Sequence, residues 1–507
     1  MKIRTVGHNM KYEAECIAML FFPDEKIVTT EYPADTEFSP QSDQMQEDYI
    51  ETRLQHGLMK VTVRLNGEEN SLCRTIPSNP HGPYEQAEYR MSDMLFTLLC
   101  QATGTHPAWG MLTGVRPIKL FHKRLDAGMS EEMVARDFSQ HFYVTDEKID
   151  LALQTARNEA PILKEATDDT YSLYISIPFC PSRCSYCSFV SHDITSKRAR
   201  DILPVYVDRL CDELACIAQK MAQTELSLTT VYFGGGTPTI LSAAQLEQIC
   251  TAVEKNFDLS RLKEYTVEAG RPDTIDREKL RVLRAHNVTR ISINPQTLND
   301  QVLAGIGRKH TAQQIIDCFQ MAREEGFDDI NMDLIAGLPG ETVESFRQTV
   351  DKIIALNPEN VTVHTLSIKR SANFGTSWEE RLKALQLGQE VGQMVSYAQK
   401  ALIEYGWQPY YLYKQRNTLG NLENTGYCKP GYEGRYNIYI MDETQTILAA
   451  GGGAVTKLKS NRTGKLERIF NYKYPFEYVE HFDEILRRKD RVVKFFEENR
   501  PLPLRED

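Results

Sequence analysis

The stretch Leu173-Tyr-Ile-Ser-Ile-Pro-Phe-Cys-Pro-Ser-Arg-Cys-Ser-Tyr-Cys187 joins a short apolar segment to a loop that carries three cysteines. The apolar segment ends at Pro178, which is typical of a buried strand that stops there. The cysteines follow at once, as Cys180, Cys184 and Cys187. The stretch therefore predicts a strand that presents three thiols just past its carboxyl end.

From this strand onward, short apolar segments alternate with long amphipathic ones. Strands are predicted over residues 173–177, 229–233, 264–268, 290–293, 330–335 and 361–366. Strands separated by helices in this way form βαβ units and a parallel sheet. Six such units predict an α/β protein with an open or closed barrel, whose functional residues gather at the carboxyl ends of the strands.

The flanking segments have a different texture, so we expect three parts: an N-terminal α+β domain over residues 1–165, the barrel over 166–371, and a mixed, partly helical C-terminal extension over 372–507. In the last part the pattern predicts a helix over 378–405, a Gly- and Tyr-rich stretch over 410–453 and a charged helical tail. We expect the extension to cover the substrate.

The N-terminal part shows a hairpin pattern followed by helical ones. Residues 58–65 alternate and are followed by Asn66-Gly67, which predicts a type I′ turn. Helices are predicted over 84–101, from Pro117 to Gly128, and after Thr145. The apolar run 16–22 predicts a buried strand or a helical turn. This part carries no grouping of metal ligands or nucleophiles, and we expect a role in substrate or partner recognition.

The composition excludes several classes of protein. The 507 residues are 41% hydrophobic and 25% charged, as in globular proteins of several domains, and the net charge of −11 argues against a surface that coats nucleic acid. No stretch approaches the roughly 18 apolar residues that cross a bilayer, and no signal peptide frames the start. Eleven mostly isolated cysteines fit reduced thiols. We predict a cytoplasmic protein with no nucleic-acid partner and no stable membrane span.

Three cysteines within one short loop can converge on a soft metal, and thiolates select zinc or an iron–sulfur cluster. Structural zinc takes four ligands, so a zinc site here requires a fourth, such as His192 or a distant cysteine. A cluster held by three thiolates leaves one iron open to a small molecule. From the residues alone, both metals remain possible.

The pattern CxxxCxYC after a strand resembles the radical S-adenosylmethionine (SAM) superfamily. The resemblance implies that Cys180, Cys184 and Cys187 hold a 4Fe-4S cluster, and that its open iron chelates the methionine part of SAM. It implies further that electron transfer from the cluster cleaves SAM to methionine and a 5′-deoxyadenosyl radical. Tyr174 and Tyr186 are then expected to line the cluster and SAM.

Further polar and Gly-rich segments follow the later strands. Gly234-Gly235-Gly236-Thr237-Pro238 follows the second one, where glycines allow close approach to a ligand or a tight connection to the next helix. The resemblance implies that Gly235, Gly236 and Thr237 bind the amino group of SAM. Four residues are expected to bind its ribose, carboxylate and adenine, unless they are surface charges: Glu268, Gln296, Arg308 and Asp333.

These motifs together narrow the resemblance to the coproporphyrinogen branch of the superfamily. Residues 109–117 and 420–424 resemble its longer, HemZ-type members. The resemblance implies an oxygen-independent dehydrogenase that converts two propionates of coproporphyrinogen III to vinyl groups, yielding protoporphyrinogen IX and carbon dioxide in porphyrin and heme biosynthesis. It also implies an electron donor such as flavodoxin or ferredoxin.

A tetracarboxylate substrate requires cations and a flat wall. The candidate cations are Lys369, Arg370, Lys414, Arg416 and Arg435. Seven tyrosines are candidates for the wall or for a packing layer: Tyr410, Tyr411, Tyr413, Tyr427, Tyr432, Tyr436 and Tyr439.

Two departures keep an alternative open. Shorter dehydrogenases of the branch carry another cysteine where this chain has Phe189, a feature shared with its heme chaperones. Those chaperones carry a His-Asn pair where this chain has Tyr436-Asn437. The alternatives are a heme-delivery chaperone, with His192 or His364 as an axial ligand, and a radical SAM enzyme that acts on another tetrapyrrole.

Overall fold

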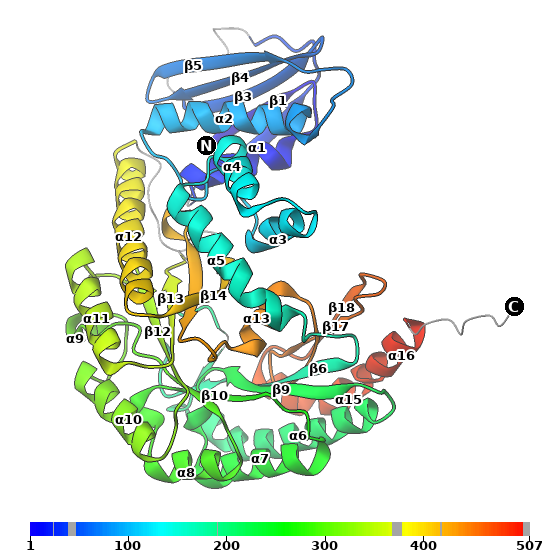
Figure 1. Ribbon diagram of the computed structural model, residues 1–507, viewed down its shortest axis with the longest axis vertical. Coiled ribbons are helices and arrows are strands. Elements are labelled where there is room, and N and C mark those ends of the chain that lie inside the picture. The colour runs from blue at the N-terminus through cyan, green and yellow to red at the C-terminus, as the bar shows by residue number, and fades with distance from the viewer. Residues whose placement is uncertain (24, 39–46, 190, 368–377, 416–417, 500–507) are drawn as a thin grey trace, which may run out of the picture. The chain divides into compact units, whose positions relative to one another are not determined.

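The structure, a computed structural model, describes all residues except 24, 39–46, 190, 368–377, 416–417 and 500–507. The chain forms two compact units (Figure 1). Unit 1 comprises Met1–Gln154, Thr365–Ser396 and Leu412–Asn424, and unit 2 comprises Thr155–His364, Tyr397–Tyr411 and Thr425–Asp507. The three-part division of the sequence stays a prediction.

Unit 1 contains a five-stranded sheet in the order β2-β1-β3-β4-β5. The strands are β1 (Lys2–Val6), β2 (Val28–Tyr32), β3 (Tyr49–Gln55), β4 (Leu58–Leu65) and β5 (Glu68–Thr75). Asn66 and Gly67 both have positive φ, as a type I′ turn requires, and β4 and β5 pair antiparallel, so the predicted hairpin is confirmed.

Two helices cover one face of this sheet (Figure 1): α1 (Lys11–Phe21) and α2 (Ala87–Thr103). Their apolar side chains form one core with those of β1, β3 and β4. Helix α2 ends at Gly104, which adopts the left-handed conformation, as predicted. The apolar run 16–22 lies mostly in α1, so the helical alternative for it is the one observed.

Three further helices follow: α3 (Ile118–Asp126), α4 (Glu131–Phe142) and α5 (Asp146–Leu163). The first and last confirm the predictions at Pro117 and Thr145. Helix α4 was not predicted, although the sequence contains a start signal for it. Ser130 accepts a hydrogen bond from the backbone of Met133, and two acidic residues occupy the first turn.

Unit 2 is built on an 11-stranded sheet in the order β14-β15-β13-β12-β11-β10-β9-β6-β16-β17-β18. Its central strands are β6 (Thr170–Ile177), β9 (Ser227–Gly235), β10 (Glu264–Gly270), β11 (Arg290–Ile293), β12 (Ile330–Ala336) and β13 (Asn360–Thr365). Neighbouring strands from β6 to β12 pair parallel. All six predicted strands are confirmed, and with them the partial (β/α)6 barrel.

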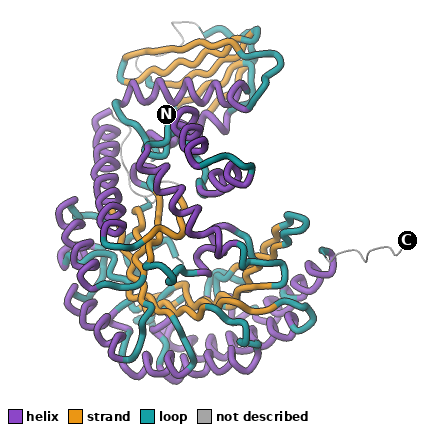
Figure 2. Tube along the Cα trace, viewed as in Figure 1, coloured by secondary structure: helices purple, strands orange, loops and turns teal. Residues whose placement is uncertain are grey.

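Helices follow these strands and lie along the outer side of the sheet (Figures 1 and 2). They are α6 (Lys197–Met221), α7 (Ala243–Asn256), α8 (Arg277–Ala285), α9 (Asp300–Gly305), α10 (Ala312–Glu324) and α11 (Val343–Leu356). Helix α12 (Trp378–Glu404) follows in sequence and has residues in both units. Side chains at their starts fix where several begin: Ser196, Ser242, Asp276, Thr311 and Thr342 each accept a hydrogen bond from the first helical turn.

The C-terminal segment extends the sheet at both ends. Strand β16 (Thr446–Ala450) pairs parallel with β6 and is followed by β17 (Val455–Lys459) and β18 (Leu466–Phe470). The other end carries β14 (Gln408–Lys414) and β15 (Glu423–Cys428). The helices are α13 (Arg435–Asp442), α14 (Pro475–Glu480), α15 (Phe482–Arg488) and α16 (Asp490–Glu498), so the mixed extension and its helical tail are confirmed. Within the described residues, no helix has the length and apolar character to span a membrane.

Candidate functional site

The cysteine loop lies at the carboxyl end of β6 and is held by backbone hydrogen bonds. Its first residues form β7 (Phe179–Cys180), which pairs with β8 (His192–Asp193). The Ile194 amide donates to the Cys180 carbonyl at 3.0 Å, and the Ser185 amide to the Ile306 carbonyl at 3.2 Å. Cys184 is buried, whereas Cys180 and Cys187 are half-buried. The loop is thus held by the segment after β8 and by the end of α9.

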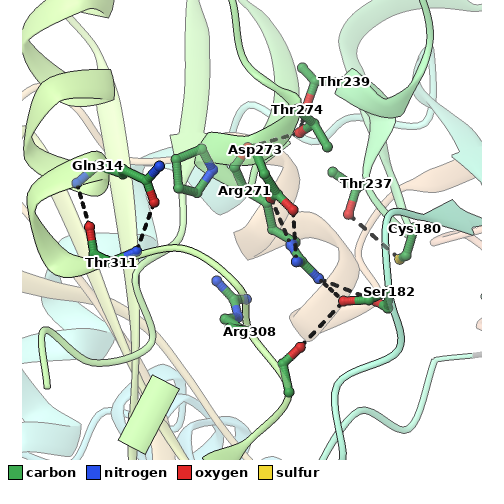
Figure 3. Close-up of polar contacts among 12 residues, drawn as sticks. Cys180, Ser182, Thr237, Thr239, Arg271, Asp273, Thr274, Arg308, Thr311 and Gln314 are labelled. Carbon is green, nitrogen blue, oxygen red and sulfur yellow. Dashed lines mark hydrogen bonds and ion pairs between the residues drawn. The ribbon is translucent and has the colours of Figure 1, made fainter. Parts of the chain in front are cut away.

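The Gly-rich segment after β9 packs directly on this loop. The amides of Gly236 and Thr237 donate to the carbonyls of Ile177 and Phe179, each at 2.8 Å. A Cβ at residue 236 would lie 2.4 Å from the Phe179 carbonyl oxygen, which explains the glycine. The Thr237 hydroxyl donates to Cys180 Sγ at 3.5 Å (Figure 3). The tight connection is therefore real, and a contact of Gly235, Gly236 or Thr237 with SAM stays a prediction.

Arg308 approaches the loop from the segment after α9. Its guanidinium donates to the Asn294 carbonyl at 2.6 Å and to the Tyr186 hydroxyl at 3.2 Å, and its Nε has no partner. Cys184 also attracts it, and burial of the phenol raises the pKa of Tyr186 above its usual range. Since its side chain is only 7% exposed, Arg308 is not a surface charge. A buried cation with an unused donor suits an anionic ligand.

Arg271, which was not a predicted site residue, directly follows β10 and is hydrogen-bonded to the cysteine loop. Its guanidinium donates two hydrogen bonds to the Asp273 carboxylate, at 2.9 and 3.0 Å, and one to the Ser182 hydroxyl at 2.9 Å (Figure 3). The only sequence signal was its place directly after a predicted strand. A bidentate pair of this kind fixes a geometry as well as a charge.

Glu268 lies at the end of β10 and accepts a hydrogen bond from the Tyr232 hydroxyl at 2.6 Å. Desolvation raises the pKa of Glu268 to about 7, while this hydrogen bond opposes the shift. The charges of Asp333 and His364 act on the same carboxyl group. The structure therefore brings Glu268 of β10 and Asp333 of β12 together, on the two strands that flank β11.

Asp333 and Gln296 are joined through the backbone of β12. The Gln296 amide donates to the Asp333 carbonyl at 2.9 Å, and Gln296 has a φ of 68°. Such a conformation is costly for a residue with a side chain and often marks a functional site. Burial opposes ionisation of Asp333, but His364 Nε2 at 3.8 Å and the Asn331 amide at 2.8 Å help to hold the pKa of its carboxyl below the usual range.

Tyr174 lies in a stack of three aromatic rings. Its ring is 6.2 Å from that of Tyr232 and 6.0 Å from that of Tyr436, and the last two are 4.4 Å apart. Burial raises the pKa of all three phenols, so they stay neutral. The stack extends from β6 and β9 to α13 and includes the residue that replaces histidine in the His-Asn pair.

Two more residues beside Arg308 carry unmet hydrogen-bonding capacity. Both ring nitrogens of His310 and the side-chain oxygen of Asn294 are buried without a partner. His310 is 4% exposed, and burial together with Arg308 lowers the pKa of its imidazole to about 4. Buried polar groups are normally satisfied, so this group marks a place where a ligand completes the bonding.

The donor set fits an iron–sulfur cluster chemically, because three thiolates are what such clusters take. In the part of the chain that the structure describes, no three His, Cys, Asp or Glu side chains are grouped closely enough to hold a metal ion. The assignment of Cys180, Cys184 and Cys187 as ligands therefore stays a prediction that rests on their residue type and shared loop.

The candidate cations for binding substrate carboxylates either contact other groups of the protein or lie outside the residues that the structure describes. Arg435 pairs with Glu165 at 3.0 Å, and Lys414 is buried and donates to the Leu112 carbonyl at 2.7 Å. Lys369, Arg370 and Arg416 lie outside the described residues. Five of the seven tyrosines are buried, as in a packing layer: Tyr410, Tyr411, Tyr427, Tyr436 and Tyr439.

Comparison with known proteins places these features in a family. A model described as the radical SAM superfamily matches residues 174–353. The chain is 40% identical over 418 residues to the oxygen-independent coproporphyrinogen-III oxidase-like protein HemZ of Bacillus subtilis (strain 168), covering 82% of each chain. It is 31% identical over 322 residues to the heme chaperone HemW of Lactococcus lactis subsp. lactis (strain IL1403), covering 63% of this chain and 79% of that protein. A solved structure, coproporphyrinogen III oxidase HemN of Escherichia coli, is 21% identical with a TM-score of 0.48, over 64% of this chain and 72% of that chain.

Proposed function

Because the chain belongs to the radical SAM superfamily, in the family of oxygen-independent coproporphyrinogen-III oxidase-like proteins, we propose that it oxidatively decarboxylates coproporphyrinogen III to protoporphyrinogen IX. The observation that carries the proposal is the extent of the likeness to HemZ, which continues well beyond the residues matched by the superfamily model. A bare barrel would support only the superfamily chemistry. We place this activity in the cytoplasm, with an electron donor of the flavodoxin or ferredoxin type.

Radical SAM proteins use a 4Fe-4S cluster and SAM, which together supply a 5′-deoxyadenosyl radical that removes a hydrogen atom from an unactivated carbon. In each of two propionates, the reaction removes one hydrogen atom and carbon dioxide and leaves a vinyl group. The remaining electron passes to a one-electron acceptor. The hydrogen atom ends on 5′-deoxyadenosine.

The chain's own residues have three tasks in this proposal. Cys180, Cys184 and Cys187 would hold the cluster. The backbone amides of Thr237 and Ile194 donate hydrogen bonds to carbonyls of the loop that carries these cysteines and so fix it. Arg308 would neutralise the carboxylate of SAM, because its cation is buried beside the loop and retains an unused donor. Its position is set by Asn294 and Tyr186 before any ligand arrives.

The carboxyl groups of Glu268 and Asp333, on β10 and β12, suit the uncharged nucleoside part of SAM. Burial keeps Glu268 partly protonated near neutral pH, so it can both accept from and donate to a ribose hydroxyl. Asp333 stays ionised beside His364 and accepts hydrogen bonds only. Gln296 has a strained backbone and is hydrogen-bonded through its main chain to Asp333, which supports a shared role in binding the nucleoside.

A second function, heme delivery, is favoured by the likeness to HemW and by the exposed Phe189, 62% exposed, where shorter dehydrogenases have a cysteine. Against it, the position of the chaperone histidine is Tyr436, which is buried in the aromatic stack. His192 keeps its Nε2 buried without a partner, and His364 faces Asp333.

The test is an anaerobic assay with reconstituted cluster, SAM, a chemical reductant and coproporphyrinogen III. Mass spectrometry follows 5′-deoxyadenosine and the porphyrins together. We expect two molecules of 5′-deoxyadenosine for each macrocycle that loses two carboxyl groups. Cleavage of SAM with an unchanged porphyrinogen would refute the substrate but keep the reaction class, and stoichiometric heme uptake without turnover would favour the chaperone.

A further inference from the structure

The segment that leads away from the cysteine loop carries an unusual charge for this chain. Residues 180–200 contain four cations, Arg183, Lys197, Arg198 and Arg200, and one carboxylate, Asp193, a net charge of +3 in a chain whose net charge is −11. All four cations are exposed. We call these four residues the cationic rim.

The cationic rim lies against the cysteine loop rather than elsewhere on the barrel. Arg183 lies within the loop, and β8, which pairs with β7 at Cys180, leads directly into helix α6, where the other three cations lie. His192 of β8 lies between the loop and helix α6. Burial lowers the pKa of its imidazole, and the charges of Arg198 on the helix and Arg183 on the loop lower it further. Both guanidinium groups therefore approach one ring of β8.

Apolar groups lie among these cations. Arg198 stacks over the Phe476 ring at 3.9 Å, and the His192 ring packs edge-on against the same ring at 5.0 Å. A groove between α6 and α14 is lined by Lys197, Arg198, Asp201, Ile202, Val205, Phe476, Val479 and Glu480. Val205 is 44% exposed, and Phe189 beside the third cysteine is 62% exposed. Exposed apolar groups with a charged rim are typical of a protein-docking site, and here the charged lining of the groove consists of two cations, Lys197 and Arg198, and two carboxylates, Asp201 and Glu480.

We propose that the cationic rim, with Phe189 and the groove along α6, docks a small acidic one-electron carrier protein that reduces the cluster. The inference rests on the proposed function, since it assumes a cluster on the neighbouring loop. One electron leaves the reduced flavin or iron–sulfur centre of the carrier and enters the cluster, and no bond or proton moves. Charge complementarity selects this partner, because an acidic carrier is attracted to a positive surface on an otherwise acidic protein.

Complementarity of this kind acts mainly on the rate of encounter. Steering by exposed charges raises association rates by roughly 10- to 1,000-fold and is screened by salt. The two carboxylates of the groove, Asp201 and Glu480, bring the net charge of residues 180–200 and the groove together from +3 to +1, so this surface stays positive in a chain whose net charge is −11. A carrier docked there brings its redox centre to the side of the loop that carries Arg183.

The double variant Lys197→Glu/Arg200→Glu tests the proposal. Both positions lie in the first turn of α6, where acidic residues favour the helix dipole, so the variant should fold. The matched control Lys255→Glu/Lys494→Glu makes the same change in net charge on the exposed surfaces of α7 and α16. Two quantities are measured on the full chain: the rate of cluster reduction by reduced flavodoxin, and the affinity for oxidised flavodoxin without SAM.

We expect both quantities to fall by about tenfold or more at low ionic strength in the α6 variant, to change little in the control, and to converge at high salt. Reduction by photoreduced 5-deazaflavin, a small molecule, should be equal in all three proteins. Equal flavodoxin rates and affinities in the α6 variant would overturn the docking surface. So would loss of self-association in that variant with unchanged flavodoxin rates, because a second copy would then be the occupant. If deazaflavin also fails to reduce the wild-type protein, the proposed function fails, and the docking surface falls with it.

Discussion

Two clusters of buried polar side chains in unit 2 differ in how many of their atoms have a hydrogen-bond partner. Glu213 of α6 accepts hydrogen bonds from the Gly451 amide, the Asn471 amide group and the Tyr478 hydroxyl, each at 2.7 Å, and pairs with Lys489 at 2.8 Å. We call these residues the Glu213 network. By contrast, the Arg308 cluster, made of Arg308, Asn294, His310 and Tyr186, contains four buried polar atoms without a partner.

The difference separates a structural role from a binding role. The Glu213 network ties α6 to the segment after β16 and to α14, and each of its charges is matched inside the protein. An incomplete network in the same unit is costly unless something else completes it. The Arg308 cluster lies beside the cysteine loop, where a cofactor would supply the missing partners. We therefore expect substitutions in the two groups to affect different measurements.

The largest effect is expected at the loop itself. Cys184→Ala should abolish the 4Fe-4S absorbance and all SAM cleavage, because two thiolates do not hold a cluster with an open iron. The control Cys216→Ala removes a half-buried cysteine of α6 and should keep both signals. Iron content and 5′-deoxyadenosine are measured after anaerobic reconstitution. Retained cleavage in Cys184→Ala would mean that this thiol is not a ligand.

The Glu213 network should respond in stability. Glu213→Gln leaves the Lys489 ammonium, 1% exposed, without its charge partner, and breaking a buried pair in this way costs about 3–5 kcal/mol. Its neighbour on the helix offers the control, because the exposed pair of Asp212 with Arg209 contributes little and Asp212→Asn should change stability by about 0.5 kcal/mol at most. Thermal and urea unfolding measure both. Equal stability of the two variants would remove the structural role of the network.

The Arg308 cluster should respond in binding instead. Arg308→Ala removes a charged hydrogen-bond donor, so we expect SAM affinity to fall by about 10- to 100-fold, the equivalent of roughly 1.5–3 kcal/mol. Cluster absorbance should stay, and the loss of stability should be smaller than in Glu213→Gln. Lys309→Ala, the exposed neighbour, is the control. SAM affinity is measured by titration calorimetry. An unchanged affinity in Arg308→Ala would mean that the Arg308 cluster does not bind SAM.

The sequence predicts the centre of the fold better than its edges. The six barrel strands have local signals, an apolar run bounded by turn residues, so they were found. Strand β16 also has an apolar run, which ends at Gly451, but its place in the sheet depends on pairing with β6 across about 275 residues of sequence. Helix α4 was missed although Ser130 caps it, because its apolar stripe is narrow.

The candidate site shows the same limit. The cysteines, the Gly-rich segment and Arg308 were selected from the sequence, whereas Arg271 was not, nor were Asn294 and His310, although these two lie in the same segments as Gln296 and Arg308. Their importance comes from burial, since all three are at most 9% exposed, and burial is a property of the packed protein. Arg435 pairs with Glu165 and the buried Lys414 donates to the Leu112 carbonyl, so a contact of either residue with a substrate carboxylate stays a prediction.

The smallest expected effect concerns Glu268. Its pKa is raised by burial from 4.5 to about 7, so the folded protein binds a proton that the unfolded chain releases between these values. Stability should therefore be greatest below pH 4.5 as far as this group is concerned, and should decline as the pH rises to about 7. Tyr232, Asp333 and His364 face the carboxyl group and contribute to the shift. Glu268→Gln removes the titration, so we expect it to be more stable than the wild type above pH 7, by about 1–3 kcal/mol, and to match it below about pH 4.

The difference between the two unfolding curves isolates Glu268 from other buried acids. Asp329, whose pKa burial raises to about 6, titrates in the same range, but it does so in both proteins and cancels in the difference. Asp333→Asn provides the opposite case, because the pKa of that carboxyl is lowered and its loss should destabilise the protein above pH 4. A difference curve for Glu268→Gln that stays flat from pH 5 to 8 would mean that the carboxyl is ionised throughout. The proposal that it donates a hydrogen bond to the ribose would then fail, while the assignment of Arg308 would stand.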